Sequence, residues 1–176
     1  MSDLPPAPTA RDLHWVAFVA LRGHTTDTDL LAPLLLSTAR SGDTQLVTVA
    51  TRLLVDAEPR LWLSLDVSLR HVWARVGDSV LPVDEPLVLA LAACHPDGYE
   101  REAAVTRLAG LDHPLVLPVL ALRAADWVPQ VRDRARSAVE TRLGSALATL
   151  ALAPMARALR ARRDGRWLAD RLEPAG

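Results

Sequence analysis

The sequence predicts an all-α protein, and three observations support this. Pro, Gly and Asp residues divide the 176-residue chain into pieces of helix length. The apolar residues are mostly Leu, Ala and Val, with no Ile, and all 20 basic residues are Arg; Leu, Ala and Arg favour helix. The segments REAAVTRLAG (101–110) and VRDRARSAVE (131–140) also repeat one pattern, which places Arg132 31 positions after Arg101. Repetition of a short helix that cannot bury its own apolar face is typical of stacked antiparallel helical hairpins.

We expect ten helices between these Pro, Gly and Asp residues. They cover 10–22, 28–40, 43–57, 60–76, 84–94, 98–109, 114–124, 127–143, 145–163 and 166–172. Start signals are N-cap residues and first-turn prolines, at Asp27, Asp43, Asp84, Asp97, Asp126, Pro33 and Pro129. Stop signals are Gly23, Gly77 and Gly110. The most strand-like stretch, LVTVATRLLV (46–55), fits a helical stripe at least as well.

Apolar stripes predict how three of these helices are buried. Helix 127–143 has one continuous apolar face, formed by Val128, Val131, Ala135, Ala138 and Val139. Helix 60–76 is apolar over a wider surface and carries Trp62 and Trp73, so we expect neighbours on more than one side. Helix 145–163 keeps its stripe in phase through Pro154, which predicts a kinked helix rather than two helices.

The stretch HPDGYEREAAVTRLAGLDHPLVLPVLALRAADWVPQVRDRARSAV (95–139) resembles bacterial HEAT-type repeats. The matching positions are Asp97 with Arg101, Asp126 with Arg132, and the first-helix dipeptide Leu117-Pro118. The resemblance implies a right-handed α-solenoid in which Asp and Arg form a ladder between adjacent units, and we expect Arg132 to pair with Asp97. The Asp-to-Arg spacing is four residues in one unit and six in the next, so the ladder departs from the regular family pattern.

This resemblance predicts a single solenoid domain with three regions. Residues 1–9, which are polar and Pro-rich, form an N-terminal arm; residues 10–94 form helical repeats without the motif, like atypical capping units. Residues 95–172 form HEAT-like repeats and end in a basic segment.

The charge of the chain is divided unevenly. Residues 1–100 carry 7 Arg against 13 acidic residues, and residues 101–176 carry 13 Arg against 8. Six of the Arg lie in the C-terminal segment, at 157, 160, 162, 163, 166 and 171. This segment is interpreted as a solvated helix face, an anion-binding surface, or a contact for an acidic protein. Contact between the oppositely charged halves of two copies predicts weak, salt-sensitive self-association.

No catalytic or metal-binding motif stands out. The sequence has no G-x-S-x-G, P-loop, G-x-G-x-x-G or C-x-x-C pattern, and His95 and His113 each precede a proline as turn residues do. We therefore expect a non-enzymatic protein without cofactor or metal. The single Cys94, the polar N-terminus without an apolar leader, and apolar runs too short for a bilayer predict a cytoplasmic protein with no membrane contact.

Trp62 and Asp66 share a helix face, and this pair is similar to one in alkylpurine DNA glycosylases of HEAT-like fold, where an aromatic residue and an Asp cradle a damaged base. The pair lies in the acidic half of the chain, whose negative net charge would repel the phosphates of a nucleic acid. The simpler interpretation is that Asp66 pairs with Arg70 at i, i+4 and that the tryptophans fill the core.

The sequence therefore predicts a non-catalytic scaffold that binds a protein partner through the polar face of its second helices. Nucleic-acid binding or DNA repair by a HEAT-like fold is the alternative. The expected contact residues on helix 127–143 point away from its apolar stripe; they are Gln130, Asp133, Arg134, Ser137 and Thr141. Arg157, Arg160 and Arg163 of the basic segment are further candidates.

Overall fold

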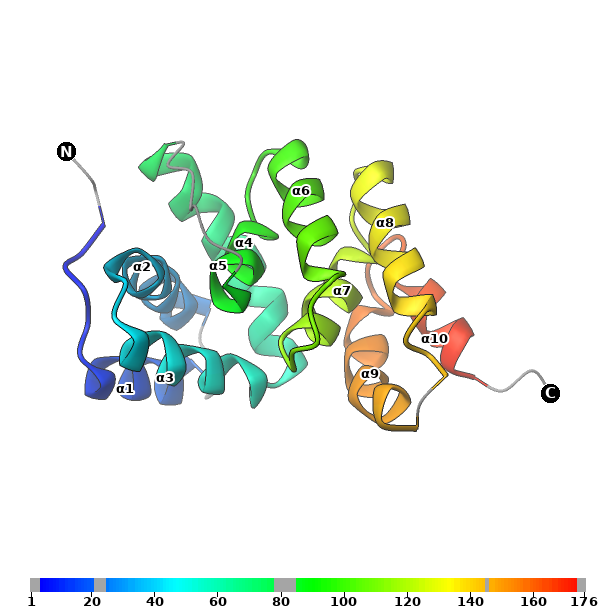
Figure 1. Ribbon diagram of the computed structural model, residues 1–176, viewed down its shortest axis with the longest axis horizontal. Helices are drawn as coiled ribbons and strands as arrows, with labels where there is room; N and C mark the ends of the chain where they lie inside the picture. The colour runs from blue at the N-terminus through cyan, green and yellow to red at the C-terminus, as the bar shows by residue number, and fades with distance from the viewer. Residues whose placement is uncertain (1–3, 21–24, 78–84, 145, 174–176) are drawn as a thin grey trace.

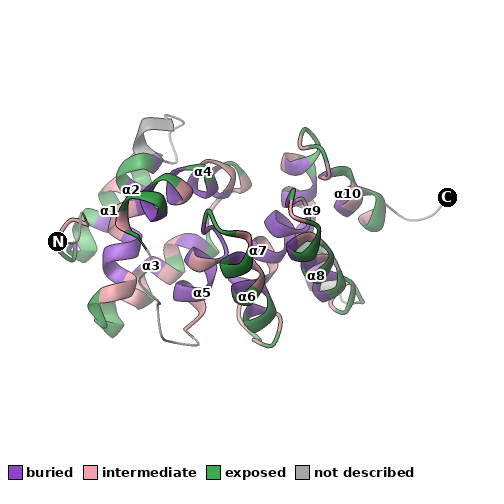
Figure 2. Ribbon diagram, turned by 90° about the horizontal axis from the view of Figure 1, so that it is seen from above, coloured by how far each residue is buried: buried purple, intermediate pink, exposed green. Residues whose placement is uncertain are grey.

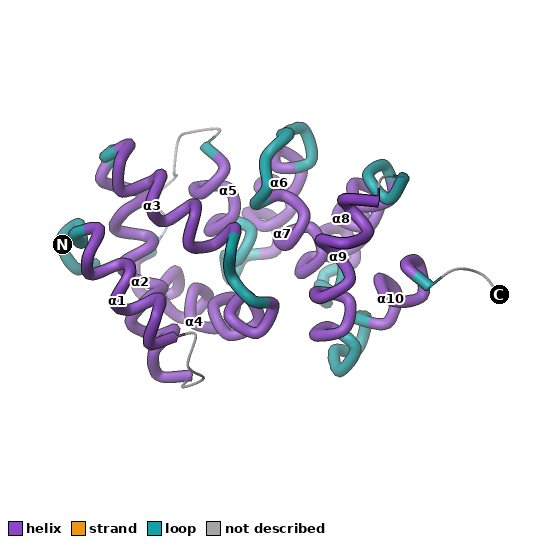
Figure 3. The backbone as a smooth tube through the Cα atoms, turned by 90° about the horizontal axis from the view of Figure 1, so that it is seen from below, coloured by secondary structure: helices purple, strands orange, loops and turns teal. Residues whose placement is uncertain are grey.

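A computed structural model describes residues 4–20, 25–77, 85–144 and 146–173. These residues form ten helices and no strand, so the all-α prediction is confirmed (Figures 1 and 3). The helices are α1 (Ala10–Ala20), α2 (Thr25–Ser41), α3 (Thr44–Val55), α4 (Pro59–Val76), α5 (Pro86–Ala92), α6 (Gly98–Leu108), α7 (Val116–Arg123), α8 (Pro129–Glu140), α9 (Ala146–Leu159) and α10 (Arg166–Leu172).

Four of the predicted start and stop signals, Asp43, Asp97, Pro129 and Gly77, are found at helix ends, whereas Asp126 lies two residues before Val128, the N-cap of α8. The carboxylate of Asp43 accepts hydrogen bonds from the backbone N–H groups of residues 45 and 46, and that of Asp97 accepts one from Tyr99 at 2.7 Å. Pro129 is the first residue of α8. Gly77 ends α4 with φ 72, in the left-handed region that favours glycine.

Some boundaries differ from the prediction. Helix α2 begins at Thr25, so Asp27 lies inside it and Pro33 lies in its interior. The side chain of Glu85 caps α5 by accepting from the N–H of Val88 at 2.9 Å. Asp84 and Gly23 lie outside the described residues.

The helices follow one another along the long axis of the molecule (Figure 1). Helix α2 packs against α1 and α4, α6 packs against α5 and α8, and α7 packs against α8 and α9. Helix α10 closes the array against α9. Buried side chains from α1 to α10 belong to one continuous hydrophobic core, and Figure 2 shows the buried faces of the helices turned toward their neighbours.

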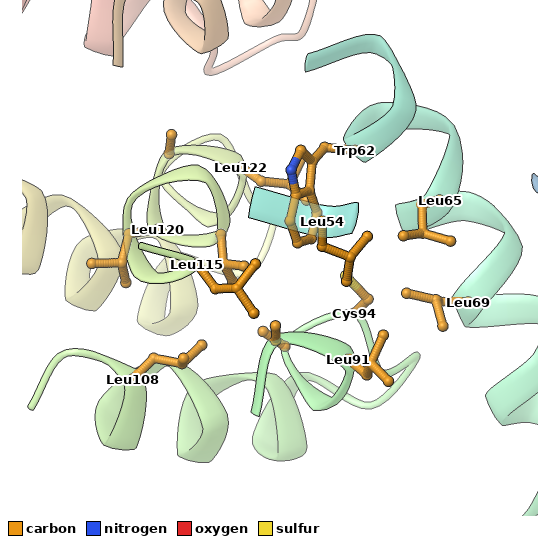
Figure 4. Packing of buried hydrophobic residues seen from close by; sticks show 14 of the residues in the cluster. Leu54, Trp62, Leu65, Leu69, Leu91, Cys94, Leu108, Leu115, Leu120 and Leu122 are labelled. Carbon is orange, nitrogen blue, oxygen red and sulfur yellow. The ribbon is translucent and has the colours of Figure 1, made fainter. Parts of the chain in front are cut away.

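The predicted apolar stripes face this core. In α8, Val131, Ala135, Ala138 and Val139 are buried. Helix α4 contacts α2, α7 and α9, which confirms that it is covered on more than one side. Its Trp62 is 1% exposed and packs among leucines of the core (Figure 4). Helix α9 continues through Pro154, as predicted, and ends at Leu159.

Candidate functional site

All five contact residues predicted on α8 line one groove. Gln130, Asp133, Arg134, Ser137 and Thr141 border a volume of about 550 Å³ between α6 and α8. We call this the polar groove; its remaining lining residues are Glu102, Thr106, Ala109, Ala138 and Arg142. The α8 side chains reach the groove because they lie on the face opposite the buried stripe.

An ion pair spans the polar groove. Arg134 of α8 donates from Nε and Nη2 to Oε1 of Glu102 on α6, at 3.3 and 3.0 Å. The Arg134 side chain is 47% exposed, so solvent screens this pair. The groove therefore offers hydroxyl, amide and charged groups of both signs to a ligand.

A second, larger groove lies beside it. This apolar groove has a volume of about 710 Å³. Its lining comes from the α3–α4 connection, the start of α4, residues 111–118 and α9, with Val55, Pro59, Trp62, Leu117, Pro154 and Met155 among the apolar side chains. Arg142 lines both grooves, so they meet at this residue.

Trp62 lines the apolar groove, and its indole carries a donor without a partner among the described residues. Its indole Nε1 is shielded from solvent and has no hydrogen-bond partner within the described part of the chain. Figure 4 shows this nitrogen on the side of the ring away from Leu54 and Leu65. A buried donor without a partner is unfavourable.

The three predicted residues of the basic segment lie elsewhere. Arg157 and Arg160 border a hollow of about 290 Å³ between α9 and α10, where Arg160 pairs with Glu173. Arg163 is exposed beyond the end of α9. The structure therefore separates these residues from the polar groove.

An Arg–Asp ion pair connects α6 with the residues before α8, but it does not involve the two residues that we expected to pair. Arg101 of α6 donates from Nε to Oδ2 and from Nη2 to Oδ1 of Asp126, both at 3.0 Å. Its Nη1 donates to the carbonyls of His95 and Pro96 at 2.9 and 2.8 Å. Every nitrogen of this fully buried guanidinium has an acceptor.

The expected pair of Arg132 with Asp97 is wrong. Arg132 contacts Asp133 at 3.5 Å and Asp164 at 3.6 Å, while the Asp97 carboxylate caps α6. The reason lies in where each Asp stands: Asp97 is the N-cap of α6, whereas Asp126 lies two residues before Val128, the N-cap of α8. Arg101 therefore contacts an Asp that lies shortly before α8, and Arg132 contacts Asp164, which lies shortly before α10.

The ladder continues into a larger charge network that includes Asp66. Arg123 donates from Nη1 to Asp126 at 2.9 Å, and its Nη2 lies 2.6 Å from Oδ1 of Asp66. Arg70 contacts the same Asp66 oxygen at 3.3 Å, which confirms the predicted i, i+4 pair. Arg162, which follows α9, reaches the other Asp66 oxygen at 3.4 Å.

Sequence reasoning did not assign Arg123 or Arg162 to this network. Arg123 stands three residues before Asp126 in the last turn of α7, a spacing that allows a local ion pair. No sequence signal links Arg162 to Asp66, because only the packing of α9 against α4 brings them together.

The network keeps its carboxylates ionised. Burial raises the pKa of Asp66, but the guanidiniums of Arg123, Arg70 and Arg162 outweigh burial and hold the pKa below its ordinary value. The pKa of Asp126 is also lowered, because hydrogen bonding and charge from Arg101 and Arg123 exceed the effect of burial. Asp66 and Asp126 are therefore anions at neutral pH.

Cys94 is buried, and His95 and His113 lie in turns. Burial raises the pKa of the Cys94 thiol to about 12. The Nδ1 atoms of His95 and His113 accept hydrogen bonds from the backbone N–H groups two residues further on, at 3.1 and 3.2 Å, as turn residues do.

Within the described residues, no three His, Cys, Asp or Glu side chains are grouped so that they could hold a metal ion. No helix among them is long and apolar enough to cross a membrane.

Comparison of the chain with known protein families, curated proteins and solved structures gives no match.

Proposed function

We propose that this chain is a non-catalytic, cytoplasmic interaction protein, a short HEAT-like solenoid that binds a protein partner across the polar and apolar grooves. The observation that carries the proposal is the meeting of the two grooves at Arg142. The Arg101–Asp126 contact between successive units supports the solenoid, since the family resemblance implies such a ladder.

The two grooves together have the composition of a protein interface. Such interfaces combine an apolar centre with a polar rim of hydrogen-bonding and charged groups. The apolar groove provides Leu117, Pro154 and Met155, and the polar groove provides Gln130 and Ser137. A partner segment would place an apolar side chain in the apolar groove and direct polar groups to α8.

Nucleic-acid binding has weaker support. The polar groove contains Glu102 and Asp133, which repel phosphates. In the basic segment, Arg160 pairs with Glu173 and Arg171 pairs with Glu140 at 3.0 Å, so part of its charge is already neutralised. Trp62 is buried in the core and Asp66 is held by three guanidiniums, which leaves neither available as a base cradle.

The test is affinity capture from native cells with a variant of the polar groove. The double variant R134E/S137E places two carboxylates on the exposed face of α8 and should lose the captured partner. The matched control T48E/R52E likewise replaces one hydroxyl residue and one Arg by Glu, on exposed positions of α3, and should retain the partner. Both variants should keep the wild-type circular dichroism spectrum.

Equal capture by wild type and R134E/S137E would reject the polar groove as the contact. In that event, capture by a variant with Arg157, Arg160 and Arg163 changed to Gln would test the basic segment.

A further inference from the structure

The charge network contains more cations than anions. Four guanidiniums, from Arg70, Arg101, Arg123 and Arg162, surround the two carboxylates of Asp66 and Asp126. All carboxylates in this connected set are shared between Arg residues, so it carries two excess positive charges. The side chains of Arg101 and Arg123 are 0% and 1% exposed. The two carboxylates balance these two buried guanidiniums, so the excess charge lies on the less buried Arg70 and Arg162, where an added anion would balance it.

Two donors of this network are unused. Nη1 of Arg70 and Nε of Arg123 are shielded from solvent and have no hydrogen-bond partner among the described residues. Arg101, by contrast, directs all its nitrogens to acceptors. The excess charge and the unused donors therefore occur at the same place, around Asp66 rather than around Arg101.

The network reaches solvent beside Asp66. Arg70 and Arg162 contact opposite oxygens of this carboxylate, and their side chains are 15% and 31% exposed. The guanidinium of Arg70 also lies over the ring of Trp127, 4.3 Å from its centroid, and Trp127 is an exposed residue. This contact fixes the Arg70 side chain at the edge of the network, since a cation is attracted to the face of an indole.

We propose that Arg70 and Arg162 form a binding site for a doubly charged phosphate group, either inorganic phosphate or a phosphate monoester. A dianion matches the two excess charges, whereas a carboxylate or a phosphodiester would balance only one. The forked donors of Arg suit phosphate oxygens, and within the described residues Arg162 directs only Nη1 to Asp66 and is 31% exposed. Asp66 does not repel the ligand strongly, because three guanidiniums already share its charge.

This site is distinct from the two grooves and does not depend on the proposed function. Neither Arg70 nor Arg162 lines the polar or the apolar groove. The R134E/S137E variant should therefore bind phosphate as the wild type does.

The test is a titration of the purified chain with inorganic phosphate and with phenyl phosphate, each to about 10 mM at constant ionic strength set with chloride, followed by thermal unfolding and calorimetry. Saturable binding of one ligand per chain is expected. The affinity for phenyl phosphate should rise between about pH 5 and 7, as its second proton leaves near pH 6. Dimethyl phosphate, with one charge, should bind at least about tenfold more weakly.

Substitution of single Arg residues tests whether phosphate binds at Arg70 and Arg162. R70Q and R162Q should each weaken phosphate binding about tenfold or more, which corresponds to the loss of one charged contact. R75Q removes an exposed Arg from the same helix α4 and should bind as the wild type does. R162Q provides an independent result if R70Q does not fold, because Arg162 is partly exposed and makes a single contact with Asp66.

Three results would overturn the proposal. They are the absence of any phosphate effect beyond that of chloride, unchanged phosphate affinity in R162Q, and equal affinity for the diester and the monoester. Tight binding of an oligonucleotide that is lost in R70Q and R162Q, without monoester binding, would replace the dianion site by a nucleic-acid contact.

Discussion

Arg101 and Asp126 lie 25 residues apart and face each other through two parallel hydrogen bonds of 3.0 Å, with both side chains buried. Asp126 also accepts the N–H of Val128 at 3.0 Å, so the same carboxylate fixes the start of α8. One contact therefore ties α6 to the beginning of the next repeated helix. It sets the register between the two helices that border the polar groove.

We expect Arg101→Ala to lower the free energy of unfolding by about 3–5 kcal/mol, because it leaves the carboxylate of Asp126 buried with fewer partners. Urea unfolding followed by circular dichroism measures the effect. Arg134→Ala is the matched control: it breaks the exposed pair with Glu102 and should cost less than about 1 kcal/mol. Equal losses in the two variants would contradict the role assigned to Arg101.

Stability should fall at acidic pH through Asp66 and Asp126. Their pKa values are lowered in the folded chain, so the folded state binds fewer protons than the unfolded state at low pH. Their contribution is present above the unfolded pKa of about 3.9 and is lost as the pH falls through the folded values. Urea midpoints measured from pH 7 to pH 3 should decline most steeply below about pH 4. Asp126→Asn should lower the midpoint at pH 7 and flatten this decline; an unchanged acid slope would contradict the assignment.

Cys94 should report global unfolding. Its thiol is buried, and its pKa is raised to about 12, so almost no thiolate exists in the folded chain at pH 8. We expect alkylation by iodoacetamide to be slow in the native protein and to increase with urea along the circular dichroism transition. Arg101→Ala should shift both curves to lower urea together. Fast alkylation without urea would show that Cys94 opens locally.

Gly165 should not tolerate a side chain. A Cβ atom at this position would lie 1.8 Å from the carbonyl oxygen of Leu159, so the backbone between α9 and α10 would have to move. We expect Gly165→Ala to cost about 1–3 kcal/mol in thermal or urea unfolding. At Gly110 the nearest atom is 3.5 Å away, an ordinary contact, and Gly110→Ala serves as the control. Similar midpoints for both variants would contradict the close approach.

Self-association should depend on salt. The first hundred residues carry six more acidic than basic groups, and residues 101–176 carry five more Arg than acidic groups. Head-to-tail contact between copies would weaken as salt rises, since exposed charges are screened beyond about 8 Å at physiological ionic strength. Sedimentation velocity at low and high salt measures this, and a mass that does not change with salt would contradict it.

Local patterns predicted the helices and the outward face of α8, because both depend on residues close in sequence. Asp43 and Asp97 cap helices through N–H groups two or three residues away, and Gly77 ends a helix by its own conformation. The outward position of the α8 residues that line the polar groove follows from helical spacing, since residues opposite a buried stripe must face outward; their contact with a partner stays a prediction.

The charge network could not be predicted in the same way. Only the Asp66–Arg70 pair has a local spacing, and it was the pair predicted correctly. The contact of Asp66 with Arg162 spans 96 residues and depends on how α9 packs against α4. The Asp97–Arg132 prediction was wrong because the repeat motif does not show that one Asp caps its own helix while the other faces the preceding unit.

The long-range ion pairs of Asp66 affect how the chain would unfold. An array whose units touch only their neighbours can unravel from either end, one unit at a time. In this chain the carboxylate of Asp66 on α4 forms ion pairs with Arg123 of α7 and with Arg162, which follows α9. Separation of α7 and the C-terminal helices from α4 would therefore remove two of the three cations that contact this carboxylate. The unfolding of the C-terminal part is in this way coupled to a buried charge in α4.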